Sequence, residues 1–296
     1  MDRTDAPTPE RRLGGALEPV IGQVFFSPEA HAAYADLGFQ PSAHEANGVA
    51  LPDGPAYFTS RGSLMGQVRG SVVASAFAVF NPTAVIPSVD YGWSITDAPT
   101  ICAARDAGAL GQLERLLGPT PTGHERVAEL LVRATDDLSV EGRPLAAGVA
   151  GLPDPDAPLG TIFRRGEILR EYRGDNHTAA WIGAGLDAVE ISLLTEQYWG
   201  LAPRTYARTR AWSDDDFDRA AESLRSRGLV DADGGFTPDG RAFREQIEVD
   251  TDAMTAPVMA RLGDDLDELI ELLTPWGATV RAGKGYLSSG PHDLAG

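Results

Sequence analysis

The chain has 296 residues, of which 43% are hydrophobic and 23% are charged, and this composition excludes wholesale disorder. Asp and Glu outnumber Lys and Arg by 43 to 25, and the resulting net charge of −18 would repel a polyanion such as DNA. No apolar run approaches the roughly 20 residues that a membrane helix needs. We therefore expect a folded protein that does not span a membrane, and the negative charge weakens any role in binding nucleic acid.

The chain ends and the single cysteine give further expectations. Residues 1–22 lack the long apolar core of a secretory leader, so we predict a disordered tail there and a cytoplasmic protein. Residues 277–296 are predicted to be a flexible tail. Cys102 is the one cysteine, which excludes an intrachain disulfide and a cysteine zinc site, and its apolar neighbours indicate a small buried residue.

Helix signals dominate the first half of the chain. Ser27-Pro28-Glu29 is typical of a helix start, and Gly38 is expected to stop that helix. Residues 40–56 predict a loop because they are rich in Pro and Gly. Apolar spacing predicts helices near 73–80, 99–117 and 123–139. The Pro- and Asp-rich segment 152–158 is the strongest linker signal, so we place a boundary between two lobes there.

The second half predicts more helices and two short extended segments. The helices are expected at 160–173, 177–184, 187–199, 213–227, 238–254 and 258–273, and the extended segments at 229–231 and 235–237. The predicted fold is mainly α: a helical N-terminal lobe (23–152) and a winged-helix-like lobe (159–276) with a short β-hairpin. The apolar stripe from Val258 to Trp276 predicts core or the seam of a homodimer.

Part of this pattern resembles a known family. The order helix, Arg227-Gly228-Leu229-Val230, hairpin, Phe236-Thr237-Pro238, helix resembles the winged-helix half of MarR-like regulators. Over roughly residues 20–275, the chain also resembles an actinobacterial winged-helix-like family of helix-turn-helix proteins of unknown function. That resemblance rests on the segments 57–61, 80–82, 142–145, 169–177, 244–248 and 251–252. The family often carries a histidine where this chain has Val20-Ile21-Gly22, and its name implies DNA binding by analogy of fold.

The charges of the expected recognition helix argue against DNA binding. Its first turn would contain Asp214-Asp215-Asp216, with Asp218 just behind, where a winged helix approaches the phosphates. Acids in a first turn also stabilise a helix, which explains them without a partner. The expected wing, residues 231–235, contains two more acids and no basic residue. We therefore expect the winged helix to be a scaffold.

Standard catalytic and cofactor motifs are missing. The chain contains no G-x-S-x-G elbow, no phosphate-binding GK[ST] loop and no H-E-x-x-H helix. Its five histidines are scattered along the sequence, so we expect no metal site and no bound cofactor.

The densest group of reactive residues is the segment 170–177, Arg-Glu-Tyr-Arg-Gly-Asp-Asn-His. We expect Gly174 to end one helix and Asp175 to cap the next, which would place His177 in a first turn, where imidazole tends to stay neutral. A neutral imidazole can accept a proton, with Asp175 or Glu171 to orient it. We therefore predict these three residues as catalytic.

Five residues are predicted to bind the substrate. Arg170 and Arg173 would hold an anionic or enolised carbonyl by bidentate hydrogen bonds, and Gly166, on the same helix face as Arg173, would leave room for it. Tyr172, Tyr57 and Arg61 complete the predicted set. The competing interpretation is a buried ion-pair network in which Asp175 is a cap and His177 a packed core residue.

Three functions remain open. The first is a cofactor-independent enzyme, such as a lyase, cyclase, dehydratase or isomerase of secondary metabolism, that moves protons on a largely apolar small molecule with an anionic or enolisable group. The second is a MarR-like regulator that senses a ligand and binds DNA. The third is a non-catalytic small-molecule binding protein. The acidic recognition helix favours the first over the second.

Overall fold

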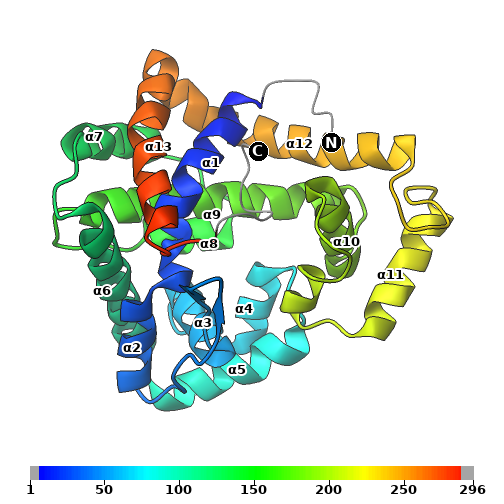
Figure 1. Ribbon diagram of the computed structural model, residues 1–296, viewed down its shortest axis with the longest axis horizontal. Coiled ribbons are helices and arrows are strands. Elements are labelled where there is room, and N and C mark those ends of the chain that lie inside the picture. Colours follow the sequence, from blue (N-terminus) through cyan, green and yellow to red (C-terminus); the bar gives the residue numbers. More distant parts are fainter. Residues whose placement is uncertain (1–6, 288–296) are drawn as a thin grey trace.

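The computed structural model describes residues 7–287 and shows a mainly α protein, as predicted (Figure 1). In chain order, the helices of the first half are α1 (Pro9–Ile21), η1 (Gly22–Phe26), α2 (Pro28–Asp36), α3 (Gly54–Gly62), η2 (Ser63–Met65), α4 (Gly70–Phe77), α5 (Pro82–Ile95), α6 (Ala98–Leu117), α7 (His124–Thr135) and α8 (Pro144–Ala150). Those of the second half are α9 (Gly160–Gly183), α10 (Ala188–Trp199), η3 (Ala207–Arg210), α11 (Asp214–Ser226), α12 (Pro238–Leu262), η4 (Gly263–Asp265) and α13 (Leu266–Ala282).

Within residues 7–287, extended structure is limited to two places. Strands β1 (Glu45–Ala46) and β2 (Val49–Ala50) form an antiparallel hairpin, with Ala46 opposite Val49. The turn between them is Asn47-Gly48, and both residues have positive φ, which favours these residue types in a tight hairpin. The loop predicted for residues 40–56 was therefore wrong for this hairpin and for the start of α3. The predicted wing is reduced to one antiparallel bridge between Val230 and Phe236.

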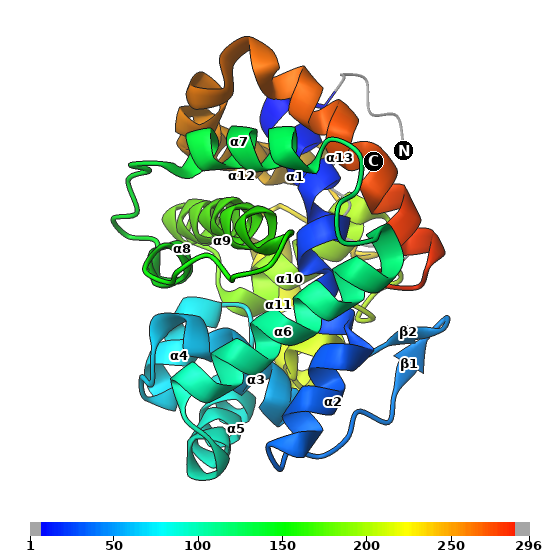
Figure 2. The ribbon, with the colours of Figure 1, turned by 90° about the vertical axis from the view of Figure 1, so that its left-hand side faces the viewer.

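Helix α9 runs through the middle of the molecule and organises the other helices. It packs against α7, α8, α12 and α1, and Figures 1 and 2 show it enclosed by them. One hydrophobic core contains buried residues from α1, α6, α7 and α8 together with residues from α9, α12 and α13. The segment 152–158 joins α8 to α9, which pack against each other. It therefore does not divide the core into the two predicted lobes.

Both predicted tails are wrong within the described residues. Thr8 caps α1, and this helix buries Leu13, Leu17, Val20 and Ile21 and packs along α13. At the other end α13 continues to Ala282, and Tyr286 is 2% exposed. The apolar spacing of α1 was obscured by Gly14-Gly15 and Pro19, which favour loops when sequence alone is considered. Residues 1–6 and 288–296 lie outside the described part of the chain.

Proline misled the prediction elsewhere because it starts helices as readily as it stops them. Asn81-Pro82, expected to end a helix, instead begins α5, because α4 already ends at Phe77: Asn81 accepts a hydrogen bond from the backbone N–H of Thr83. Helices α3 and α8 likewise have proline at their first or second position. Helix α12 continues to Leu262 rather than ending near residue 254.

Candidate functional site

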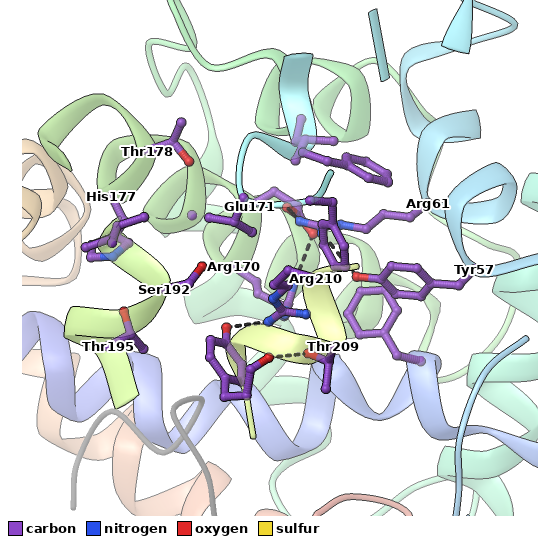
Figure 3. Close-up of a pocket in the computed structure, with 18 of the residues that line it drawn as sticks. Tyr57, Arg61, Arg170, Glu171, His177, Thr178, Ser192, Thr195, Thr209 and Arg210 are labelled. Carbon is purple, nitrogen blue, oxygen red and sulfur yellow. Dashed lines mark hydrogen bonds and ion pairs between the residues drawn. The ribbon is translucent and has the colours of Figure 1, made fainter. Parts of the chain in front are cut away.

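A cavity of about 640 Å³ lies between α3 and α4 on one side and α9 and α10 on the other (Figure 3). The connection from α10 to α11, residues 200–213, closes part of it. A volume of this size is in the range of small-molecule sites, about 300–1,000 Å³. Its lining brings together all but one of the predicted site residues: Tyr57, Arg61, Arg170, Glu171, Arg173, Asp175 and His177.

One wall of the cavity is aromatic. Tyr57 packs its ring against Phe25, Phe58, Phe77 and Phe80, with ring centroids 5.3–6.5 Å apart. These side chains come from η1, α3, α4 and the turn after α4, so segments distant in the sequence build one apolar surface. Such a surface favours a flat or cyclic apolar ligand.

A buried ion-pair network lies beside the aromatic wall. Glu171, 1% exposed, accepts a hydrogen bond from Arg61 and another from Arg170, both at 2.8 Å. Arg170 also donates to both carboxylate oxygens of Glu18, at 3.0 and 3.1 Å. Burial alone would raise the pKa of Glu171, but Arg61 and Arg170 outweigh it and lower that pKa to about 2. Glu171 is therefore ionised at neutral pH and is not a proton donor.

A second network joins α9 to α12. Arg173 donates to Glu248 at 2.9 Å and to Asp252 at 3.4 Å, and Arg244 donates to Glu248 at 2.8 Å. Two of the arginines predicted to hold a ligand anion, Arg170 and Arg173, are thus already neutralised by carboxylates. The competing sequence interpretation, a buried ion-pair network, describes these contacts well, but the network borders a cavity.

His177 lies in the middle of α9, because this helix continues through Gly174 to Gly183. The predicted helix break at Gly174 was therefore wrong, and no first-turn dipole acts on the imidazole. Its Nδ1 lies 3.2 Å from Thr251 Oγ1, whose hydroxyl donates to the carbonyl of Ile247. The Thr251 oxygen therefore accepts from Nδ1–H, and Nε2 keeps its lone pair.

The imidazole of His177 is kept neutral by its surroundings. Burial lowers its pKa to about 4, with Arg244 and Arg173 acting in the same direction against Glu248. Its side chain is 24% exposed and lines the cavity, so a ligand can reach it. Neither Glu171 nor Asp175 hydrogen-bonds this ring in the part of the chain that the structure describes, so the predicted orienting role passes to Thr251.

Asp175 caps a different helix from the one expected. Its Oδ2 accepts the backbone N–H groups of Leu145 and Ala146, both at 3.0 Å, in the first turn of α8. Burial raises the pKa of Asp175 to about 6, and the nearby Glu171 charge adds to this shift. The position of Asp175 is therefore fixed by a structural contact at the edge of the cavity.

Two further predictions about α9 were wrong. Tyr172, predicted to bind substrate, is 1% exposed and packs in the main core, with the Arg143 guanidinium 4.4 Å from its ring centroid. It faces away from the cavity because it lies on a different side of α9 from Arg173. Gly166 leaves no room for a ligand: a Cβ there would lie 2.4 Å from Ile21 Cδ1, so this glycine allows α1 to approach α9.

Tyr57 presents a hydroxyl group that is polarised from one side. Arg61 Nη1 donates to the Tyr57 oxygen at 3.3 Å, so the hydroxyl hydrogen remains to be donated to a ligand. Figure 3 shows the Tyr57 hydroxyl pointing into the cavity, while His177, Ser192 and Thr195 line another side.

The second half of the chain contributes several cavity residues that were not predicted from the sequence. Thr178, Ser192 and Thr195 from α9 and α10, and Tyr206, Thr209 and Arg210 from the α10–α11 connection, line it as well. The available signal was the length of that connection, 14 residues, where a tight helix-turn-helix has about 3–4. A long connection in a compact domain is commonly functional.

Comparison with known proteins assigns the chain to a family. A model of a helix-turn-helix family matches residues 10–287. The chain belongs to that helix-turn-helix family. Neither the curated proteins nor the solved structures gave a match.

The surface around α11, the helix predicted from the sequence to approach DNA, is acidic. Helix α11 contains five acids and two arginines, and Arg219 and Arg225 pair with Asp216 and Glu222 of the same helix. Arg204 and Arg208 before it contact Asp214. The bridge that replaces a wing contains Asp231 and Asp233 in its turn. These arginines have carboxylate partners already, so the surface offers little free positive charge to phosphate.

Two further findings concern metal binding and membrane spanning. Within residues 7–287, no group of three or more His, Cys, Asp or Glu side chains is arranged to hold a metal ion. In the same part of the chain, every helix is too short or too polar to cross a bilayer.

The low pKa of His177 predicts a specific dependence of stability on pH. The unfolded chain binds a proton on His177 below about pH 6.5, whereas the native protein resists this until about pH 4, so native stability falls as pH drops through that window. Asp175 acts in the opposite sense. Because its pKa is raised in the native protein, its contribution lowers the free energy of unfolding as pH rises towards 6. Urea unfolding of wild type and His177→Gln isolates the histidine: between pH 7.5 and 4.5, wild type should lose about 2 kcal/mol more than the variant. Equal losses would contradict the assignment.

Proposed function

We propose that this protein is a cofactor-independent enzyme that transfers protons on a largely apolar small molecule held in the cavity, and that its winged-helix half is a scaffold that does not bind DNA. The observation that supports this proposal most is that a proton acceptor and a hydrogen-bond donor line the same cavity. His177 offers the neutral Nε2 acceptor, and Tyr57 offers a hydroxyl donor held by Arg61.

A proton-transfer step fits these groups. Nε2 of His177 would take a proton from a carbon next to a carbonyl, and the electron pair of that C–H bond would move to the carbonyl oxygen. The enolate oxygen would accept a hydrogen bond from Tyr57. Returning the proton to the same or another carbon gives isomerisation. If the enolate instead expels a hydroxyl group from the next carbon, the proton on Nε2 passes to the departing oxygen, which leaves as water, and the reaction is a dehydration. Arg61, beside Tyr57, stabilises the developing negative charge.

An exchange reaction tests this step with a simple ketone. In D₂O, wild type should catalyse replacement of the acidic C1 protons of 2-tetralone by deuterium, which NMR measures directly. His177→Gln should exchange these protons at least about a hundredfold more slowly, since a positioned general base contributes roughly 10²–10⁴-fold. The control is Gln197→Asn. Gln197 lies on α10 and does not line the cavity, so this variant should exchange the protons of 2-tetralone at the wild-type rate. Exchange by His177→Gln at the wild-type rate would contradict the proposed base.

A ligand-sensing regulator is the second candidate, because the cavity borders the connection that leads directly into α11. Ligand binding would then move the helix expected to read DNA. The charges of α11 oppose this. Fluorescence anisotropy with mixed-sequence duplex DNA at physiological salt should show no binding by the enzyme proposed here, whereas clear binding that responds to a cavity ligand would favour the regulator.

A further inference from the structure

We infer that Arg210 is the anion-recognition residue of the cavity and that the ligand carries one negatively charged group, a carboxylate or an acidic enol, on an apolar ring system. This inference rests on the proposed function and names the substrate class of the same site. Arg210 was not among the residues predicted from the sequence.

Arg210 differs in its charge balance from the other arginines that line the cavity. Arg61, Arg170, Arg173 and Arg244 each have a carboxylate within 4 Å. Among the described residues, no carboxylate lies within that distance of Arg210. Because a buried or half-buried charge without a counter-ion is costly, an anionic ligand group is the expected partner.

The guanidinium of Arg210 is held in place by aromatic rings. It lies 4.6 Å from the ring centroid of Phe80 and 4.3 Å from that of Tyr206, and its Nη2 donates to the Tyr206 hydroxyl. Nε is buried and has no hydrogen-bond partner in the described chain. Nε of Arg61, Arg173 and Arg244 is also unbonded, but the charge of each of those side chains is balanced. Arg210 therefore combines a fixed orientation, an unused donor and an unbalanced charge.

The backbone around Arg210 is anchored to the opposite wall. Its carbonyl accepts the N–H of Asn81 at 2.9 Å, the next carbonyl accepts Asn81 Nδ2 at 3.1 Å, and Trp212 Nε1 donates to Val79 at 2.8 Å. These bonds tie the α10–α11 connection to the turn between α4 and α5. Figure 3 shows Arg210 projecting into the same space as the Tyr57 hydroxyl. An anion on Arg210 thus places the rest of the ligand along the aromatic wall.

A second buried donor supports a ligand with polar oxygens. Trp181 is 4% exposed and lines the cavity, and its Nε1–H has no acceptor among residues 7–287. Buried polar groups are rarely left unbonded, so the donors of Arg210 and Trp181, together with the unbonded Nε groups of the charge-balanced arginines, point to acceptors on a bound molecule.

Two fluorescent probes that differ by one charged group test the inference. 8-Anilinonaphthalene-1-sulfonate carries a sulfonate, and N-phenyl-1-naphthylamine is the same molecule without it. Arg210→Gln should weaken binding of the sulfonate probe by about tenfold or more, because a hydrogen bond to a charged group is lost, and should change binding of the neutral probe less than about twofold. Arg210→Lys should restore part of the difference.

The control is Arg208→Gln, which removes the same charge from the same short helix, η3, on a side chain that is 56% exposed and outside the cavity lining. It should leave both affinities unchanged. Equal weakening of both probes by Arg210→Gln, or no weakening of either, would overturn the anion role while leaving the cavity proposal intact. Failure of both probes to bind wild type would overturn the cavity proposal itself, and the inference with it.

Discussion

Replacing Glu171 by Gln should lower the free energy of unfolding by about 3–5 kcal/mol, because it leaves buried arginine charge uncompensated. Glu171 is the one carboxylate paired with Arg61 in the described chain, and it shares Arg170 with Glu18. The side chain of Glu171 is 1% exposed and that of Arg61 is 14% exposed. Urea unfolding at pH 7.5 measures the change.

Two further variants separate lost charge balance from lost packing. Glu268→Gln removes a carboxylate that is 45% exposed and pairs with Arg126 on the surface, so it should cost less than about 1 kcal/mol. The double replacement of Glu171 and Arg61 by Met should cost less than Glu171→Gln, since neither charge then remains alone. A loss below about 1 kcal/mol for Glu171→Gln would show that the pair is well solvated in the native protein.

Replacing Thr195 by Trp should abolish small-molecule binding, with the affinity for N-phenyl-1-naphthylamine falling by well over about tenfold. Thr195 lines the cavity from α10, and Figure 3 shows its side chain directed into it. An indole there would occupy the space that a ligand needs. A fluorescence titration gives the affinity, and thermal unfolding checks that the variant folds.

The matched control for this change is Thr274→Trp. Thr274 is exposed on α13, so the same increase in size should leave probe affinity unchanged. Unchanged affinity in Thr195→Trp would place the probe elsewhere on the protein and would contradict the cavity as the binding site.

Much of the candidate site could be predicted because its polar residues are concentrated in one helix. Arg170, Glu171, Arg173, Asp175 and His177 lie within eight residues, and all of them line the cavity. Tyr57 and Arg61 were identified from a short motif, and the structure brings them to the same space by the pair between Arg61 and Glu171. The roles within the segment were not predictable, because Thr251 and Glu248, which contact His177, lie more than 70 residues away.

The errors in the fold come from local signals that tertiary packing overrides. Gly174 is exposed in the middle of α9, where packing of the helix on both sides of it outweighs the intrinsic cost of glycine, about 1 kcal/mol. Arg210 was missed for a different reason: nothing in the order Thr209-Arg210-Ala211 indicates that the connection folds back onto Asn81. The sequence shows that residue 210 carries a cationic side chain, but it does not show that this side chain lines the cavity.

The most direct test that the cavity is the ligand-binding site is a crystal structure of the protein with 8-anilinonaphthalene-1-sulfonate. We expect one probe molecule between α3–α4 and α9–α10, with its sulfonate on Arg210 and its rings against Tyr57 and Phe80. A probe bound only on the outer surface, or a cavity closed by side chains with no probe in it, would contradict the proposal that this cavity binds an apolar anion.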